Sequence, residues 1–313
     1  MTRAPASAPV LFAVLCIVWG TSWIAMKLAL AEVPPFSFTV ARSVVAGAAM
    51  LAISGTAGPL ELLRRAPGRM LAVALLTNTL TYAGLYWGTA RASTGLAAIV
   101  NNALMPVGLF AFGLVFREEA FSRRRLAGIA LGGVGLALLF APQSAPTGDA
   151  ASLAGLAAVA AGTLAYCLGS VWSRPLLRGA SPIAVGSLQM LAGGVMMVPI
   201  AVVVEQPGPD LFAALARPIP LASLLWLSLA AGAAGLTIYL RLIRDWGPTR
   251  AGMYAFVSPL IAVVLGALAL GERLGPMEWI GGAAMLAAAA LVLPGRGAGR
   301  RRTHRNNRQP NDS

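Results

Sequence analysis

Two basic side chains fall inside long apolar stretches of this sequence. Lys27 and Arg42 each lie one or two helical turns from the end of such a stretch. A charge in apolar surroundings is costly, so it indicates a functional site unless it reaches water or finds a partner. Either side chain could bind a carboxylate of a solute. The structural alternative, which their shallow position favours, is that both reach the polar boundary or pair with Glu32.

Polar and aromatic residues lie deeper in the same stretches. A buried amide needs hydrogen-bond partners, which a wet cavity offers, and aromatic rings suit an amphipathic solute or a cation. The predicted binding set is Trp19, Asn78, Tyr82, Trp87, Asn101, Tyr166, Gln189, Tyr239 and Tyr254, with Trp23, Asn102 and Trp172 as further candidates. Taken singly, each has a structural alternative: Trp87 and Trp172 could sit at a membrane interface, and the amides could join helices. As a set, we expect several to line one cavity, which Asn78, Asn101 and Gln189 approach together.

Residues for catalysis are missing from this pattern. Lys27 is the only lysine, so the chain lacks a phosphate-binding loop with Gly-Lys-Ser/Thr, and His304 is the only histidine. The aspartates fall in connections and the tail, and neither metal-ligand nor redox cysteine spacing occurs. Cys16 and Cys167 are expected to be buried, unpaired side chains. We expect no enzyme activity, no catalytic residues, no metal and no cofactor.

Long apolar stretches must position these residues. The composition is 58% hydrophobic and only 11% charged, far from that of soluble domains. A bilayer crossing needs about 20 apolar residues. The runs that satisfy this are 10–31, 36–54, 69–89, 94–116, 124–141, 153–172, 181–204, 221–242, 250–270 and 276–294. The sequence therefore predicts an all-α integral membrane protein of about ten transmembrane helices.

The net charge of +13 is explained by orientation rather than by nucleic-acid binding. With the N-terminus inside, most Lys and Arg residues fall in inner connections and in the tail from Arg296 to Arg308. We expect both termini in the cytoplasm and the basic tail, 295–313, beside anionic lipid.

The two halves of the chain resemble each other. Pro106 and Pro259 are 153 residues apart, as are Glu119 and Glu272. The other pairs at 153 are Gly128 with Gly281 and Tyr86 with Tyr239, and pairs at 147 are Trp19 with Tyr166, Lys27 with Arg174, Pro35 with Pro182, Arg42 with Gln189, and Gly47 with Gly194. Since each half holds five helices, the second half enters the membrane from the opposite side. This predicts an inverted repeat, 10–141 and 153–294, with a solute held between the halves.

Two kinds of helix-shaping residue recur. Pro106 and Pro259 lie within the fourth and ninth runs, where proline removes a backbone donor and kinks a helix. They are predicted hinges, or else they only shape the bundle. Gly84–Gly88 and Gly128–Gly132 have the spacing that allows close helix contact, first of all within the monomer.

These motifs resemble a known family. The run Trp19-Gly20-Thr21-Ser22-Trp23 with Lys27, then Pro34-Pro35 and Arg42, resembles the opening of EamA-type members of the drug/metabolite transporter superfamily. Tyr86 to Gly95 running into Pro106, and Gly271-Glu272-Arg273-Leu274 after Pro259, are similar to it as well. Glu118-Glu119 departs from the pattern, in which Gly-Glu-Arg is usual. The resemblance covers both halves and implies a ten-helix carrier of the bacterial inner membrane, often an exporter of amino acids or related metabolites.

The leading hypothesis is a secondary transporter working by alternating access where the two repeats meet. The alternative is a passive channel or facilitator. The expected partners are a small-molecule substrate and the lipid bilayer, without nucleic acid, and the sequence leaves the oligomeric state, substrate, direction and coupling ion open.

Overall fold

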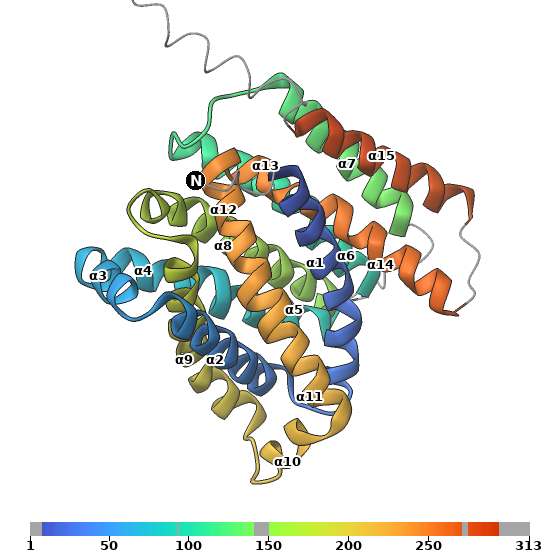
Figure 1. Cartoon of the computed structure of the whole chain (residues 1–313). Coiled ribbons are helices and arrows are strands. Elements are labelled where there is room, and N and C mark those ends of the chain that lie inside the picture. The colour runs from blue at the N-terminus through green and yellow to red at the C-terminus, as the bar shows by residue number, and fades with distance from the viewer. Residues whose placement is uncertain (1–7, 93, 141–149, 271–274, 294–313) are drawn as a thin grey trace, which may run out of the picture.

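The computed structural model describes residues 8–92, 94–140, 150–270 and 275–293, and these residues form a bundle of helices (Figure 1). In chain order the helices are α1 (Ala8–Leu30), α2 (Pro35–Ser54), α3 (Ala57–Arg65), α4 (Pro67–Ala74), η1 (Leu75–Leu80), α5 (Thr81–Thr89), α6 (Thr94–Val115), α7 (Arg123–Phe140), α8 (Ala150–Gly179), α9 (Pro182–Glu205), α10 (Leu211–Ala216), α11 (Pro218–Leu225), η3 (Trp226–Gly235), α12 (Leu236–Trp246), α13 (Pro248–Gly252), α14 (Tyr254–Leu270) and α15 (Pro276–Val292).

Each of the ten apolar runs coincides with a helix or with a continuous series of helical segments. Within the described ranges, seven helices are long and apolar enough to cross a membrane. The other three predicted crossings are α4–η1–α5, α7 and α15. Helix α7 begins with three arginines, and α15 has only 17 residues, so both fall at the margin of a crossing length. The prediction of an all-helical membrane protein is confirmed.

The bundle has two ends, which we name by the course of α1. The near face is the end at which α1 begins, and the far face is the end at which α1 finishes. Rings of Phe12 and Trp246, 5.9 Å apart, join the start of α1 to the end of α12 at the near face. At the far face, Arg217 before α11 pairs with Glu32 after α1 at 3.5 Å, and α10 lies at the same end (Figure 1).

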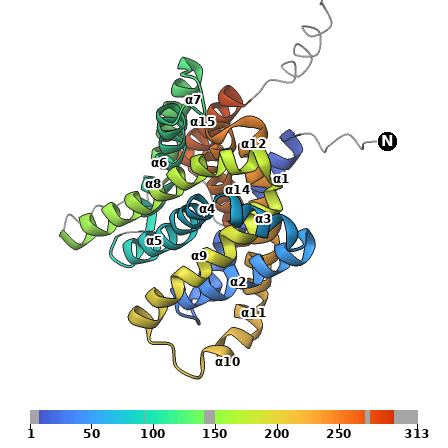
Figure 2. The same ribbon diagram turned by 90° about the vertical axis from the view of Figure 1, so that its left-hand side faces the viewer.

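The first helix of each repeat packs mainly on the other repeat. Helix α1 lies against α14 and the α11–η3–α12 series, while α8 lies against α6 and the α4–η1–α5 series. The remaining contacts are symmetric in the same sense, because α2 packs on α9 and α7 on α15 (Figure 2). This pairing is what a twofold relation between two inverted repeats requires.

Both repeats contain a π-helical segment at the same place. The 153-residue offset carries η1, 75–80, onto 228–233, which lies inside η3. A π-helical turn bonds residue i to i+5, so it widens the helix and commonly marks a functional site. Trp19 uses this feature in η3, where its Nε1 donates to the carbonyl of Ala231 at 3.1 Å.

Glycines bring α5 and α8 into backbone contact. A Cβ on Gly84 would lie 2.5 Å from the carbonyl oxygen of Ala158, and one on Gly88 would lie 2.4 Å from that of Gly155. Figure 2 shows the two helices side by side. In the second predicted spacing, a Cβ on Gly128 would lie 2.4 Å from Val292. The prediction that these glycines pack within the monomer is therefore confirmed.

Candidate transport site

A cavity of about 350 Å³ lies at the far face, where helices of the two repeats meet. Five helices supply its wall: α1, α5, α6 and α7 from the first repeat and α14 from the second. The residues that line it are Trp23, Lys27, Leu85, Thr89, Ala97, Ala98, Asn101, Asn102, Phe140, Pro259, Ala262 and Val263. Its volume falls at the lower end of the range for small-molecule sites.

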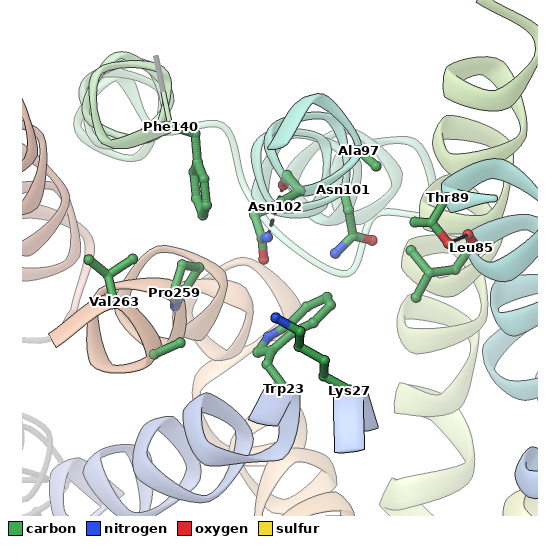
Figure 3. Close-up of a pocket in the computed structure, with 12 residues that line it drawn as sticks. Trp23, Lys27, Leu85, Thr89, Ala97, Asn101, Asn102, Phe140, Pro259 and Val263 are labelled. Carbon is green, nitrogen blue, oxygen red and sulfur yellow. Dashed lines mark hydrogen bonds between the residues drawn. The ribbon is translucent and has the colours of Figure 1, made fainter. Parts of the chain in front are cut away.

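The polar groups of the cavity come from α1 and α6. Figure 3 shows Lys27 and Trp23, on α1, facing Asn101 and Asn102, on α6. Thr163 Oγ1 lies 2.9 Å from Asn101 Oδ1, and Asn102 Nδ2 donates to the carbonyl of Ala98 at 2.9 Å. The bond to a carbonyl fixes the Asn102 amide, which presents Oδ1 as an acceptor. Thr163 Oγ1 has one proton and also lies 2.8 Å from the Val159 carbonyl oxygen, so its contact with Asn101 does not fix the orientation of that amide.

An aromatic cluster lies one helical turn deeper than the cavity. It consists of Trp19, Tyr166, Tyr239 and Tyr254, with ring centroids 4.4 to 5.8 Å apart. Trp19 precedes Trp23 by one turn on α1, and Tyr254 Oη donates to the sulfur of Met105, one turn after Asn101 on α6. Since side chains four residues apart share a helix face, this cluster lies beneath the cavity, on the side of the near face, although none of its residues is among those that line it.

A polar network joins the two repeats at the near face. The turn between α6 and α7 carries Glu119, whose carboxylate accepts from the backbone N of Thr249 at 3.2 Å, from Thr249 Oγ1, and from Arg125 Nη1 at 2.9 Å. The Glu119 side chain is only 3% exposed. Gly247 has a φ of +90°, and a Cβ there would lie 2.3 Å from Glu119 Oε1, so only glycine admits the carboxylate.

The adjoining Glu118 extends this network to α8. Its carboxylate accepts from Arg174 Nη1 at 3.3 Å and from Arg178 Nη2 at 2.5 Å. Arg117, just before it, has a φ of 56°, a left-handed conformation that is rare for residues with a side chain. The Glu118-Glu119 turn is thus held in a strained conformation that points both carboxylates at the second repeat.

Arg42 does not reach a polar boundary or Glu32, contrary to the structural alternative stated above. It is only 5% exposed, and its guanidinium carbon lies 4.2 Å from the centre of the Tyr82 ring. Its Nε and Nη2 have no hydrogen-bond partner among the described residues. Glu32 is paired with Arg217 instead.

Asn78 and Gln189 lie where α2, η1 and α9 meet, and not among the residues that line the cavity. Asn78 Nδ2 donates to Ser43 Oγ at 3.1 Å, and Gln189 Nε2 donates to Thr77 Oγ1. Both side chains are buried. Of the three amides expected to approach one cavity, the structure places Asn101 there and uses the other two to join helices.

The remaining predicted residues are divided between surface and interior. Trp87 is 41% exposed, with Arg91 stacked 3.9 Å from its ring, as expected for an interface residue. Trp172 packs edge-on against Phe116, with ring centres 5.7 Å apart. Pro259 lines the cavity, whereas Pro106 lies deeper in α6. Cys16 and Cys167 are buried and free, which confirms the prediction.

Sequence reasoning missed several cavity residues. Thr89, Phe140, Ala262 and Val263 carry no signal of their own, because threonine, phenylalanine and small apolar residues are common in any membrane helix. Lys27 was predicted as an outer basic residue, with binding of a solute carboxylate as the less favoured alternative. Glu272 and the basic tail, 295–313, lie outside the described residues.

Comparison with known proteins agrees with this architecture. The EamA-like transporter family matches residues 7–141 and 153–293. The chain is 27% identical over 289 residues to "Uncharacterized inner membrane transporter YedA" of Escherichia coli (strain K12), covering 90% of this chain and 89% of that protein. It is 25% identical over 290 residues to "Probable amino-acid metabolite efflux pump" of Salmonella typhimurium, covering 89% and 90%.

A solved structure titled "Crystal structure of protein" has the same fold, with a TM-score of 0.72 at 21% identity, over 92% of this chain and 96% of the other. The family match covers both repeats, so the resemblance read from the motifs is confirmed: this chain is a multi-pass membrane protein that belongs to the EamA-like transporter family of the drug/metabolite transporter superfamily.

Proposed function

We propose that this protein is a secondary carrier that exports amino acids or related small metabolites by alternating access. The observation that carries the proposal is the asymmetry between the two ends of the bundle. A cavity lined by both repeats lies at the far face, while the near face is joined by the Glu118 and Glu119 contacts. An alternating-access carrier has one such open end at a time.

The aromatic cluster supports the same proposal. The rings of Trp19 and Tyr254 lie 4.4 Å apart beneath the cavity, on the way that a bound solute would take to the near face. A continuous pore is what a passive channel requires. Asn101, from the predicted binding set, and Lys27, predicted as an outer basic residue, contact the solute. The aromatic residues Trp19, Tyr166, Tyr239 and Tyr254 form the layer beneath the cavity that must part for release.

Orientation follows from the distribution of arginine. Arg64, Arg65, Arg125, Arg174 and Arg178 gather at connections of the near face, which by the positive-inside rule is the cytoplasmic side. The cavity then faces the outside of a bacterial inner membrane, with both termini in the cytoplasm. One relative is named as an efflux pump for amino-acid metabolites, which supports export as the direction.

Counterflow in proteoliposomes tests the carrier mechanism. Vesicles loaded with an unlabelled amino acid or metabolite are diluted into a trace of the same labelled compound, compound by compound. A carrier gives a transient accumulation of label that saturates with concentration, because inward and outward steps share one site. Flux that rises linearly with concentration and shows no transient accumulation contradicts the carrier and favours the channel.

A matched pair of variants ties the flux to the cavity. Ala98→Trp places a large side chain in the cavity, whereas Val134→Trp places the same side chain on the exposed surface of α7. We expect the first to abolish counterflow and the second to leave it unchanged. Equal activity of both variants would place the transport path elsewhere.

A further inference from the structure

Among the described residues that line the cavity, Lys27 is the one that carries a charge. Its side chain points into the space between Trp23 and the two asparagines of α6 (Figure 3). Lys27 forms no ion pair with the described residues. At the same face, Glu32 is paired with Arg217, and Glu205 accepts from the backbone N of Phe36 and Ser37 at 2.6 and 2.8 Å.

The rest of the wall makes this charge strong. Apart from Lys27, the residues of the wall that the structure describes are neutral, and most of them are apolar. Apolar walls lower the local dielectric constant, which increases the interaction of a charge with anything that enters. The neighbouring Arg91 is engaged with Trp87, so it does not share this role.

We infer that Lys27 binds the carboxylate of the transported solute and that the cavity thereby rejects cations. This inference rests on the proposed carrier function and adds the substrate class. Lys27 supplies the positive charge, and the amide of Asn101, which lines the cavity opposite Lys27, supplies a polar group beside the same carboxylate.

The asparagine pair extends the class to zwitterions. Asn102 Oδ1 is left as an acceptor, because its Nδ2 donates to the Ala98 carbonyl, so it can bind an ammonium group in the same cavity as Lys27. Phe140 and Val263 line the opposite side and accommodate an apolar side chain. The matched ligand is a small α-amino acid with an apolar side chain, or a monocarboxylate of similar size, and not an amine or a polyamine.

The single lysine gives a direct binding assay. Trinitrobenzenesulfonate modifies accessible amines, and Lys27 is the only lysine of the sequence. Peptide mass spectrometry separates its product from those of the N-terminal amine and of the buried thiols Cys16 and Cys167. The purified protein is placed in phosphatidylcholine vesicles, which contain no anionic lipid. The probes are the standard amino acids, each compared with its amide, together with 4-methylpentanoate.

We expect at least one apolar amino acid, but not its amide, to slow modification of Lys27 in a saturable way. A charge-assisted hydrogen bond predicts about a ten- to hundredfold preference for the acid. Equal protection by acid and amide overturns the inference, as does the absence of protection by every carboxylate probe. Protection that appears only when anionic lipid is added identifies a headgroup as the ligand and also overturns it.

Two variants connect binding to transport. Lys27→Arg keeps the charge, while Lys27→Gln keeps most of the length without it. In counterflow we expect Lys27→Arg to retain the preference for acid over amide and Lys27→Gln to lose it. A saturable Lys27→Gln carrier with the wild-type preference overturns this inference but leaves the carrier intact. If flux through the wild type does not saturate, the proposed carrier function is wrong, whichever compound protects Lys27 from modification.

Discussion

The substitution Glu119→Gln should open the near face. Glu119 is the residue through which the α6–α7 turn of the first repeat bonds the start of α13 in the second. Glutamine has the same shape but no charge, and its amide nitrogen must face either Thr249 or Arg125, both of which are donors. The variant therefore loses charge-assisted bonds and gains one donor–donor conflict without leaving a cavity.

The size of the effect follows from the bonds. Hydrogen bonds to a charged group contribute about 1.5–3 kcal/mol each and neutral ones about 0.5–1.5 kcal/mol, so the loss is about 1–1.5 kcal/mol a bond and about 3–4.5 kcal/mol for the three bonds. If these bonds exist only when the near face is closed, the lower bound shifts the equilibrium toward the open conformer by about 150-fold.

An introduced thiol measures that shift. Ser170 is 2% exposed and accepts a hydrogen bond from Tyr239 Oη at 3.2 Å, so it lies at the contact of α8 with α12, beneath the aromatic cluster. Ser170→Cys is made in a background in which Cys16 and Cys167 are alanine, and labelling by a charged thiol reagent is timed. We expect Glu119→Gln to accelerate labelling at least tenfold.

Glu61→Gln is the matched control. Glu61 is 50% exposed and pairs with Arg65 along the surface of α3, where an ion pair contributes little. The Ser170→Cys protein that also carries Glu61→Gln should be labelled at the same rate as the parent, the Ser170→Cys protein alone. The reasoning fails if Glu119→Gln labels within twofold of the parent, or if the control accelerates labelling equally.

Two further predictions concern packing. Gly88→Ala places a Cβ 2.4 Å from a carbonyl oxygen of α8, so it should lower the free energy of unfolding by about 1–3 kcal/mol. The control Gly133→Ala, whose Cβ would have no neighbour within 4 Å, should leave it unchanged. Thermal melting in detergent compares the two variants, and equal melting midpoints would contradict the close contact. Trp19→Phe removes the hydrogen bond to the Ala231 carbonyl and should lower the free energy of unfolding by about 1–2 kcal/mol, and with it the melting midpoint. Trp87→Phe, on the exposed surface, should change the midpoint little. A larger effect of Trp87→Phe would contradict the role of the indole N–H.

The crossings could be predicted from sequence because hydrophobicity and charge act locally. Each apolar run reaches or approaches the length of a bilayer crossing, and its ends carry arginine, proline or glycine. The repeat could be predicted for a similar reason, since Pro106 and Pro259 keep their offset along the chain whatever they contact. Such features need no knowledge of how a helix is rotated about its axis.

The site depended on that rotation and could be predicted only in part. Asn78 and Asn101 are the same residue type at similar depth, yet one bonds Ser43 between helices and the other bonds Thr163 beside the cavity. Arg42 was expected near a polar boundary because of its position in the run, but α2 turns it toward Tyr82. The π-helical segments add to the difficulty, because each extra residue per turn rotates everything that follows.

Because α1 packs on the second repeat and α8 on the first, the rigid units that move against each other are not the two repeats themselves. A body defined by packing contains α8 with α4 to α6, and another contains α1 with α11 to α14, so neither coincides with a continuous half of the chain. If the polypeptide is cut between its halves, each fragment should expose the surface on which the first helix of the other half packs. That helix is α8 for the first half and α1 for the second. One half alone could bury that surface only by pairing with an upside-down copy of itself.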